Sequence, residues 1–179
     1  DYFVVIKGTN KRAIVRNADE FTAAAADENV DTMIFANDID FVAEGYAHDF
    51  SNGEVVSWGS RGYDASMNYI GDDHGLTGTL DGNGHVISNI TFNHDTVGSS
   101  IEAGLFGWLN GGTIKNLAIV SPEQGNLYGG GLFAYAASNN AKFEDCYFYF
   151  DESFGNYGTS QFVVAAANNI TFNRCYIEI

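Results

Sequence analysis

The stretch ISNITF at residues 87–92 decides the fold, because its pattern returns at residues 114–119 (IKNLAI), 143–148 (FEDCYF) and 172–177 (FNRCYI). The first, fourth and sixth positions are apolar in every copy, and the third holds Asn, Asn, Asp and then Arg. Successive copies start 27, 29 and 29 residues apart. A regular period of this length is typical of a solenoid, in which each repeat stacks on its neighbours.

A second pattern precedes the first by about ten residues in each repeat. Residues 104–108 (GLFGW) return as residues 131–135 (GLFAY) and, more loosely, as residues 161–165 (QFVVA). These segments are short, rich in β-branched and aromatic residues, and bounded by Gly and Asn, so they predict strands rather than helices. Strands stacked about 4.8 Å apart form parallel sheets. We therefore predict an all-β fold, a parallel β-helix with 27–30 residues per turn.

The first two inward positions of the pattern are three residues apart, which breaks strand alternation and predicts a bend. Asn89 and Asn116 would stack at this bend, because amide side chains tolerate a left-handed backbone and bond to nearby backbone groups. Asp145 would continue the ladder, whereas Arg174 could not do so in the same way. We interpret the ladder as structural. The inward column beside it is predicted to consist of Ile90, Leu117, Cys146 and Cys175.

The two cysteines of the chain, Cys146 and Cys175, fall in one column, one turn apart. Their Cα atoms would lie about 4.8 Å apart, which is inside the range of a disulfide. Side chains in register point in parallel directions, however, and this is poor geometry for an S–S bond. We expect free, buried thiols, which leaves the redox compartment open.

Residues 1–31 are predicted to close the start of the solenoid. Two short strands joined by a turn predict a hairpin. Asn17 can cap a following helix, with Glu20 three residues on as in a capping box, and this helix should end near Asn29. We expect the helix to cover the open end of the first turn, whose strand edges would otherwise recruit other chains. The β-helix itself is predicted to span residues 32–179.

The chain of 179 residues is acidic, with 8 Lys plus Arg against 23 Asp plus Glu and a formal net charge of -15. Nucleic-acid binding is not expected, because phosphate contacts need clustered cations. Anionic membranes and polyanionic sugars would also be repelled. No run of eighteen apolar residues is present, so we expect no membrane insertion. The first residue is not Met and no capping helix follows the last repeat. We therefore expect a longer chain, or other protein subunits stacked on the uncapped C-terminal end.

Part of the sequence resembles a known family. Residues 36–41 (ANDIDF), 76–92 (LTGTLDGNGHVISNITF) and 103–119 (AGLFGWLNGGTIKNLAI) are similar to the GLUG-type repeats of bacterial surface proteins, within the pectin-lyase-like superfamily. The resemblance covers about residues 17–179 and implies a right-handed parallel β-helix. It implies no single function, since the superfamily includes lyases, glycosidases, adhesins and phage tail proteins. The third and fourth copies lack the GGTIKN signature of residues 111–116.

The repeats do not pair carboxylates as glycosidases do, whose two acids lie about 5–10 Å apart. In the aligned columns Glu144 lies between Lys115 and Asn173, and Asp145 has Arg174 as a neighbour. A lyase resembling the superfamily's enzymes would need an Arg or Lys base beside Ca²⁺ held by acids. The acids near the few cations of the repeats fit ion-pair partners better. We therefore predict no catalytic residue.

Metal ligands are sparse in the sequence. Residues 81–85 (DGNGH) carry alternate oxygen ligands but lack the later Glu of a calcium loop. Residues 72–74 (DDH) could bind a cation together with loop carbonyls. A plain turn and a solvated acidic loop are the simpler interpretations, and the four His residues show no zinc spacing. We predict no metal and no cofactor, with Ca²⁺ as the alternative.

A long loop at residues 42–74 is the first candidate binding region, because it leaves the repeat pattern. It contains Trp58, Arg61 and Tyr63, which could form a contact surface. Loops of this length in compact domains are often functional. The alternative is a packed lid over one flank of the β-helix.

A second candidate is a pair of aromatic columns. Trp108 and Tyr135 occupy equivalent positions of the second pattern, as do Phe106 and Phe133. Facing outward, they would form a strip that stacks on sugar rings or fits an interface. Facing inward, they would only stabilise the core. We expect Phe106 and Phe133 in the core and leave both alternatives open for the other pair.

Two functions follow from these observations. The first is a non-enzymatic module, extracellular, on a cell surface or in a virion, that serves as a spacer and as a surface for adhesion or assembly, with glycans among its partners. The alternative is a carbohydrate-active enzyme: a polysaccharide lyase, a glycosidase or a tailspike-like depolymerase. The enzyme would need a cleft in which acids from adjacent turns converge. The acids concerned would be Asp38, Asp40, Asp72 or Asp73, opposite Glu144 or Asp145.

Overall fold

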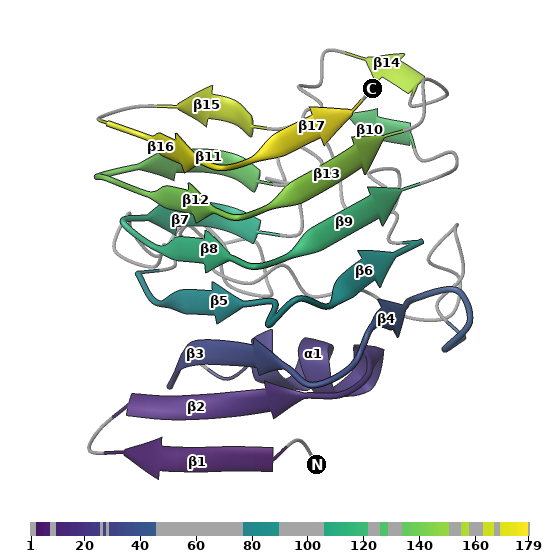
Figure 1. Cartoon of the computed structure of the whole chain (residues 1–179), viewed down its shortest axis with the longest axis vertical. Helices are drawn as coiled ribbons and strands as arrows, with labels where there is room; N and C mark the ends of the chain where they lie inside the picture. The colour runs from purple at the N-terminus through teal and green to yellow at the C-terminus, as the bar shows by residue number, and fades with distance from the viewer. Residues whose placement is uncertain are drawn as a thin grey trace.

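The fold is mostly strand, with its strands in parallel sheets, as the sequence predicts (Figure 1). The computed structural model describes residues 3–7, 10–25, 27, 29–45, 77–89, 106–121, 126–128, 134–150, 155–157, 163–166 and 169–178. Within the later repeats, each repeat adds one strand to each of three sheets. Figure 1 shows these strands as successive layers between the N-terminal hairpin and the last repeat.

The largest sheet has seven strands in the order β1-β2-β3-β5-β8-β12-β16. Only β1 and β2 pair antiparallel, and all the other neighbours are parallel. Its strands are β1 (Phe3–Lys7), β2 (Asn10–Val15), β3 (Val30–Phe35), β5 (Thr79–Asp81), β8 (Thr113–Lys115), β12 (Lys142–Glu144) and β16 (Thr171–Asn173).

A second sheet has five parallel strands in the order β17-β13-β9-β6-β4. It follows the seven-stranded sheet across a bend in every layer, because β9, β13 and β17 come directly after β8, β12 and β16. Its strands are β4 (Ile39–Asp40), β6 (Val86–Ser88), β9 (Ala118–Ser121), β13 (Tyr147–Phe150) and β17 (Tyr176–Glu178).

Two smaller parallel sheets complete the described strands. One has three strands in the order β15-β11-β7, and the other pairs β10 with β14. Strands β10 and β14 lie outside both repeated sequence patterns, so the repeats do not predict them. Their parallel pairing places them side by side in successive repeats. The strands are β7 (Phe106–Asn110), β11 (Ala134–Ser138), β15 (Val163–Ala166), β10 (Asn126–Tyr128) and β14 (Gly155–Tyr157).

Helix α1 (Ala18–Ala25) begins after Asn17, as predicted. The Glu20 N–H donates to Asn17 Oδ1 at 2.8 Å, which is the expected cap. The carboxylate of Glu20 differs from a capping box, because it accepts from the N–H and guanidinium of Arg16 rather than from the cap residue. The helix also ends earlier than near Asn29, and a turn closes where the Asp27 N–H donates to the carbonyl of Ala24.

The hairpin and α1 share the task that the sequence assigns to the helix alone. The hairpin covers the strand edge, because β2 pairs in parallel with β3 and continues the seven-stranded sheet. Helix α1 covers the apolar interior instead. Its buried Phe21 meets Phe35 and Phe41 edge to face, with ring centroids 6.1 and 5.9 Å apart.

Two inward columns form the core between the larger sheets. In the seven-stranded sheet the strand register aligns the first column, and in the five-stranded sheet it aligns the second. Every member is fully or almost fully buried. The first column is Met33, Leu80, Ile114 and Phe143, and the second is Ile39, Ile87, Ile119 and Phe148.

The register of the first full copy differs from the predicted alignment. The sequence pattern places Ile87 beside Ile114, whereas the structure pairs Ile87 with Ile119 and Leu80 with Ile114. The reason is the length of the corner: residues 82–85 connect β5 to β6, whereas two residues connect β8 to β9. In this copy only, the residues that match the predicted pattern therefore lie in the strand after the corner and not in the strand before it.

Candidate functional site

The bend between the two larger sheets carries a column of left-handed residues. In the later repeats these are the ladder positions that the sequence identifies, and a positive φ there fits the expected bend. Arg174 shares the conformation, although its side chain cannot act as an amide does. The residues are Asn83 (φ 52°), Asn116 (φ 52°), Asp145 (φ 54°) and Arg174 (φ 53°).

Asn89 is not part of this column, which corrects the predicted ladder. It has a positive φ of 54°, but it follows β6, and its N–H donates to the carbonyl of Val120 at 3.2 Å. The stretch from Asp81 to Asn83 takes its place beside Asn116, whose Nδ2 donates to Asp81 Oδ1 at 3.0 Å. Ile90 lies outside the described residues.

The acids at the bend are engaged by neighbouring side chains. Lys115 Nζ lies 3.1 Å from the Asp81 carboxylate. Partial burial alone would raise the pKa of Asp81, but hydrogen bonds from Asn116, the Asn83 N–H and Lys115 outweigh it, so the pKa is lowered. Two turns further along the stack, the Arg174 guanidinium donates two bonds to the Asp145 carboxylate and lowers its pKa.

The column beside the bend places acids next to cations or amides. Glu144 pairs with Lys115 on one side and Asn173 on the other, as the sequence alignment predicts. Asp145 faces Arg174 in the same way. Two carboxylates of a glycosidase must face the same bond, whereas Asp145 is bound by Arg174 and Glu144 lies in register between Lys115 and Asn173. This part of the surface therefore forms structural ties between turns.

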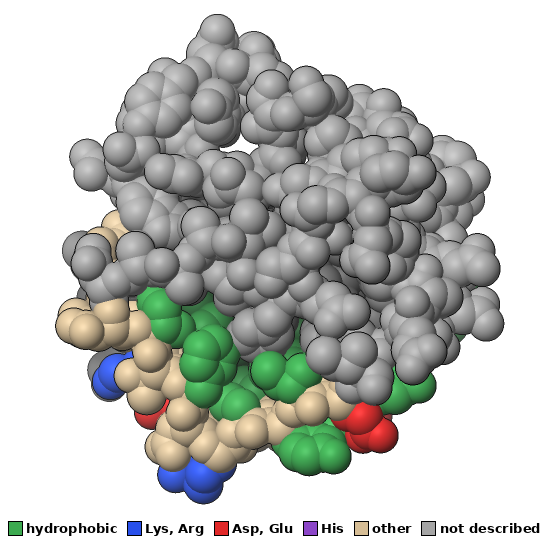
Figure 2. Space-filling model, turned by 90° about the horizontal axis from the view of Figure 1, so that it is seen from above, with side chains coloured by type: hydrophobic (Ala, Val, Ile, Leu, Met, Phe, Trp, Pro, Cys, Tyr) green, Lys and Arg blue, Asp and Glu red, His purple; other side chains and the backbone are tan. Residues whose placement is uncertain are grey.

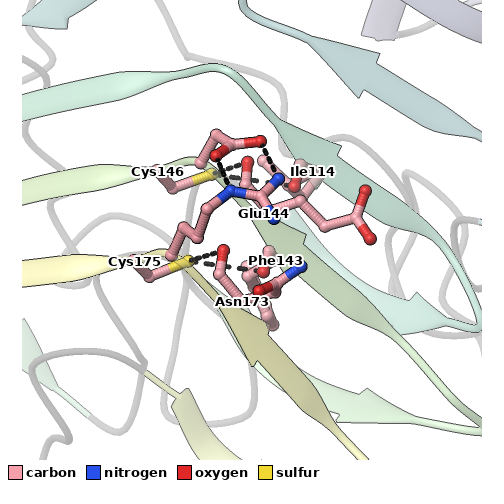
Figure 3. Close-up of polar contacts among 8 residues, drawn as sticks. Ile114, Phe143, Glu144, Cys146, Asn173 and Cys175 are labelled. Carbon is pink, nitrogen blue, oxygen red and sulfur yellow. Dashed lines mark hydrogen bonds and ion pairs between the residues drawn. The ribbon is translucent and has the colours of Figure 1, made fainter.

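The cysteines are free in the structure. Cys146 is buried beside Leu117, and Cys175 packs against the core half-buried, so these three members of the predicted column lie in successive turns. Figure 3 shows the two thiols one above the other. The Cys146 thiol donates to the carbonyl of Glu144 at 3.3 Å, and the Cys175 thiol donates to the carbonyl of Phe143 at 3.3 Å. Burial raises the pKa of Cys146 to about 12, so its thiol is not a nucleophile at neutral pH.

The corner at residues 81–85, which the sequence offers only as an alternative calcium site, is closed on itself. Asp81 accepts from the N–H of Asn83 and from Asn116, and His85 Nδ1 lies 3.1 Å from the exposed Asp38. Asp38 also accepts from the Val86 N–H, so it fastens the corner to the first turn. No group of three potential metal ligands occurs among the residues that the structure describes. The second candidate, at 72–74, lies outside them.

The aromatic residues chosen from the sequence are not brought together by what the structure describes. Trp58, Arg61 and Tyr63 lie outside the described residues. Trp108 is in β7 and Tyr135 in β11, but the register pairs Trp108 with Ala136, so the two aromatic residues do not share a column. The same shift pairs Phe106 with Ala134 and not with Phe133.

The outward side of β13 and β17 carries an aromatic surface that the sequence interpretation missed. We call it the tyrosine face. Burial alternates along β13, with Phe148 fully buried and the residues on either side partly exposed. This alternation is visible in the sequence as Tyr-Phe-Tyr, and it could have indicated an outward aromatic pair. The face consists of Tyr147, Tyr149, Tyr176 and Glu178.

The tyrosine face is a small ordered array. Tyr147 pairs with Tyr176, and Tyr149 pairs with Glu178. The rings of Tyr147 and Tyr176 are parallel within 5°, with centroids 5.8 Å apart, which is an offset stack. The Tyr147 hydroxyl donates to Glu178 Oε2 at 2.9 Å, and this bond raises the pKa of Tyr147. Tyr176 is 61% exposed, so the array offers ring surface to a partner.

Apolar side chains also gather at the last described layer. Figure 2 views the molecule from this end and shows hydrophobic side chains beside the backbone of the described strands. Phe172 and Ile177 are 49% and 43% exposed. Phe172 stacks on the fully buried Phe143 with centroids 4.8 Å apart, and Ile177 continues the column of Phe148. In the earlier layers the next strand covers the equivalent residues.

The described part of the chain has no helix long and apolar enough to cross a membrane. A family model described as "putative pectate lyase-like adhesive domain" matches residues 12–174. Neither the curated proteins nor the solved structures gave a match to the chain. The matched region includes most strands of the two larger sheets, the bend and β13, whereas β1 and β17 lie outside it, and with β17 Tyr176 and Glu178 of the tyrosine face.

Proposed function

The chain belongs to the pectate lyase-like adhesive domain family, and on that premise we propose that it is a non-enzymatic adhesive module. Its fold in this proposal is a right-handed parallel β-helix with GLUG-type repeats, closed at its start by residues 1–31. The description of the family as adhesive is consistent with a surface-exposed role. Location on a cell surface, in the extracellular space or in a virion is part of the proposal, as is a role as spacer.

The tyrosine face is the observation that carries this proposal. Adhesion needs a rigid surface with side chains that lose little entropy on binding, and Tyr supplies contact area with few rotatable bonds. The rings of Tyr147 and Tyr176 are held by their stack and by Glu178, and the strands beneath them rest on the buried Phe148. A partner would therefore meet a preorganised surface, which lowers the cost of binding.

The enzyme alternative finds less support in the described residues. A glycosidase needs two carboxyl groups at a defined separation on one bond, and a lyase needs a free base beside its substrate. The acids of the bend, Asp81 and Asp145, are held by Lys115 and Arg174 instead. Hydrogen bonds lower the pKa of both acids, from Asn116, the Asn83 N–H and Lys115 to Asp81 and from Arg174 to Asp145, and this opposes a role as general acid at neutral pH.

The test measures binding and cleavage on the same ligands. Beads coated with the chain are applied to an array of immobilised polysaccharides, acidic proteins and basic proteins, and soluble products are assayed for new reducing ends and unsaturated sugars. We expect retention without cleavage, and loss of retention in the double variant Tyr147→Ser, Tyr176→Ser. The matched control is Thr79→Ser, Thr113→Ser, which alters the outward side of the other sheet. If sugar products are released by the parent chain but not by Asp81→Asn or Asp145→Asn, the chain is an enzyme. If the chain is retained on none of the ligands, the adhesive function is refuted.

A further inference from the structure

We propose that the partner of the tyrosine face is a protein segment rich in Lys and Arg. This inference rests on the proposed adhesive function and names the chemistry of its ligand. Cations are attracted to the faces of aromatic rings and to carboxylates, and the face presents both within one small array. A side chain bound over Tyr176 would lie next to Glu178, which belongs to the same strand.

The rings are suited to cation binding by their geometry. An offset stack leaves part of each ring uncovered, and Tyr176 is 61% exposed. The hydroxyl of Tyr147 already donates to Glu178 at 2.9 Å, so its proton is not free to bond with a sugar hydroxyl. The ring surfaces of Tyr147 and Tyr176 therefore remain as the contact area for a partner. An ammonium or guanidinium group uses that surface through its attraction to the ring quadrupole.

The charge of Glu178 distinguishes the tyrosine face from the acids at the bend. Asp81 is paired with Lys115, and Asp145 with Arg174. Glu178 is exposed and, among the described residues, its carboxylate contacts the neutral hydroxyl of Tyr147 and has no cation bound to it. A partner that brings its own cation completes an ion pair that the chain leaves open.

The charge of the whole chain acts in the same direction. Its 23 acidic residues against 8 basic ones produce a net charge of -15, which accelerates the approach of basic partners and repels acidic ones. A neutral glycan would gain nothing from this field, and a polyuronate would be opposed by it. The observations therefore favour a basic protein segment over a sugar as the partner.

The experiment uses a fluorescein-labelled oligolysine peptide and its N-acetylated counterpart as probes, with the intact chain and fluorescence anisotropy as the readout. We expect Glu178→Gln and Tyr176→Leu each to weaken oligolysine binding about two- to fivefold at low salt. The matched control is Glu144→Gln, which removes the same charge from the outward side of the other sheet and should change binding by less than about twofold. Unchanged melting temperatures would show that the variants still fold, since both altered residues are exposed.

The outcomes distinguish binding of the peptide at the tyrosine face from its general attraction to the acidic chain. Weaker binding in the two face variants than in Glu144→Gln, together with no binding of the acetylated peptide, supports the proposal. Equal effects of Glu178→Gln and Glu144→Gln, or equal binding of the acetylated peptide, would overturn it. Retention of a neutral polysaccharide that depends on Tyr176, with no such dependence for oligolysine, would also overturn it and leave the adhesive function standing. Only the absence of retention on every ligand of the array would refute both the basic partner and the adhesive function.

Discussion

The seven-stranded and the five-stranded sheets meet at one bend and share one interior, yet their outward sides differ. On the seven-stranded sheet, Lys115 binds the outward carboxylate of Asp81 within the chain. On the five-stranded sheet the outward side presents the rings of Tyr147 and Tyr176, with Glu178 beside them. The first surface ties adjacent turns together, and the second remains available to a partner.

This difference shows that stacking and recognition are carried by different residues of the same strands. Inward positions alternate with outward ones, so Phe148 can fix the layer while its neighbours vary. The outward positions of β13 and β17 are therefore free to specify a ligand at little cost to the fold. Changes to the interior should damage both surfaces, and changes to one outward side should leave the other intact.

Removing an interior side chain should have the largest effect on stability, because both outward surfaces depend on the shared interior. Phe143 is fully buried and lies between Ile114 and Phe172 in its column. Phe143→Ala should lower the free energy of unfolding by about 3–5 kcal/mol, because it removes contacts and leaves a cavity. Chemical denaturation measures this change, and the exposed neighbour Lys142→Ala serves as control. A loss below about 1 kcal/mol would show that the columns are not closely packed.

Substitution of the corner residue Gly82 should have the second largest effect on stability. A Cβ on Gly82 would lie 2.5 Å from the carbonyl oxygen of Asn116 and 2.6 Å from Leu117 Cα, so the backbone of one turn would have to move. Gly82→Ala should cost about 1–3 kcal/mol in denaturation experiments. Gly84 has φ +83° with open space around it, and Gly84→Asn should be nearly neutral, because Asn tolerates that conformation. Equal costs at both positions would mean that the turns do not approach closely there.

The same corner explains why the sequence predicts the later repeats better than the first. Apolar spacing and the Asn, Asp and Arg positions place the strands, the bend and the buried column correctly from Ile114 onward. In the first copy, Ile87-Ser88-Asn89 imitates Ile114-Lys115-Asn116, although it belongs to the strand after the corner. A pattern of residue types cannot reveal two additional corner residues, because the corner follows the backbone and not the spacing of apolar side chains.

The candidate site was less predictable than the fold for a related reason. Trp108 and Tyr135 look equivalent in sequence, but a one-residue shift in register separates them, and such a shift reverses which side a residue faces. The tyrosine face has a clear signal in Tyr147-Phe148-Tyr149, where alternation about a buried Phe predicts outward rings. The hydrogen bond from Tyr147 to Glu178, 31 residues away, depends on pairing between turns and has no local signal.

The ion pair on the seven-stranded sheet should have a modest and pH-dependent effect. The pKa of Asp81 is lowered in the folded chain, so its stabilising contribution is present above the unfolded value, near pH 4, and is lost as pH falls through the lowered folded value. Asp81→Asn keeps an acceptor oxygen but loses the charge that binds Lys115. It should lower the unfolding free energy at pH 7 by about 0.5–1 kcal/mol.

Denaturation at several pH values measures this contribution. The difference between Asp81→Asn and the parent chain should shrink as the medium becomes strongly acidic, because the parent carboxyl is then protonated. Lys115→Gln is the matched change on the other partner and should reduce the same pH dependence. A difference that stays constant down to strongly acidic pH would assign the effect to hydrogen bonding alone.

The smallest effect is expected at Arg174, where backbone conformation and charge can be separated. Its guanidinium binds Asp145, but both side chains are largely exposed, and ion pairs at the surface contribute little. Its φ of 53° is the more demanding feature, because a left-handed backbone is unfavourable for most side chains.

Arg174→Asn loses the ion pair and suits the conformation, so we expect a melting temperature close to that of the parent chain. Arg174→Val loses the same pair and adds a β-branched side chain in a left-handed position, so we expect a fall of a few degrees. Thermal melts of both variants decide the issue: equal falls would assign the role of Arg174 to its charge, and a fall in the Val variant alone assigns it to the geometry of the bend.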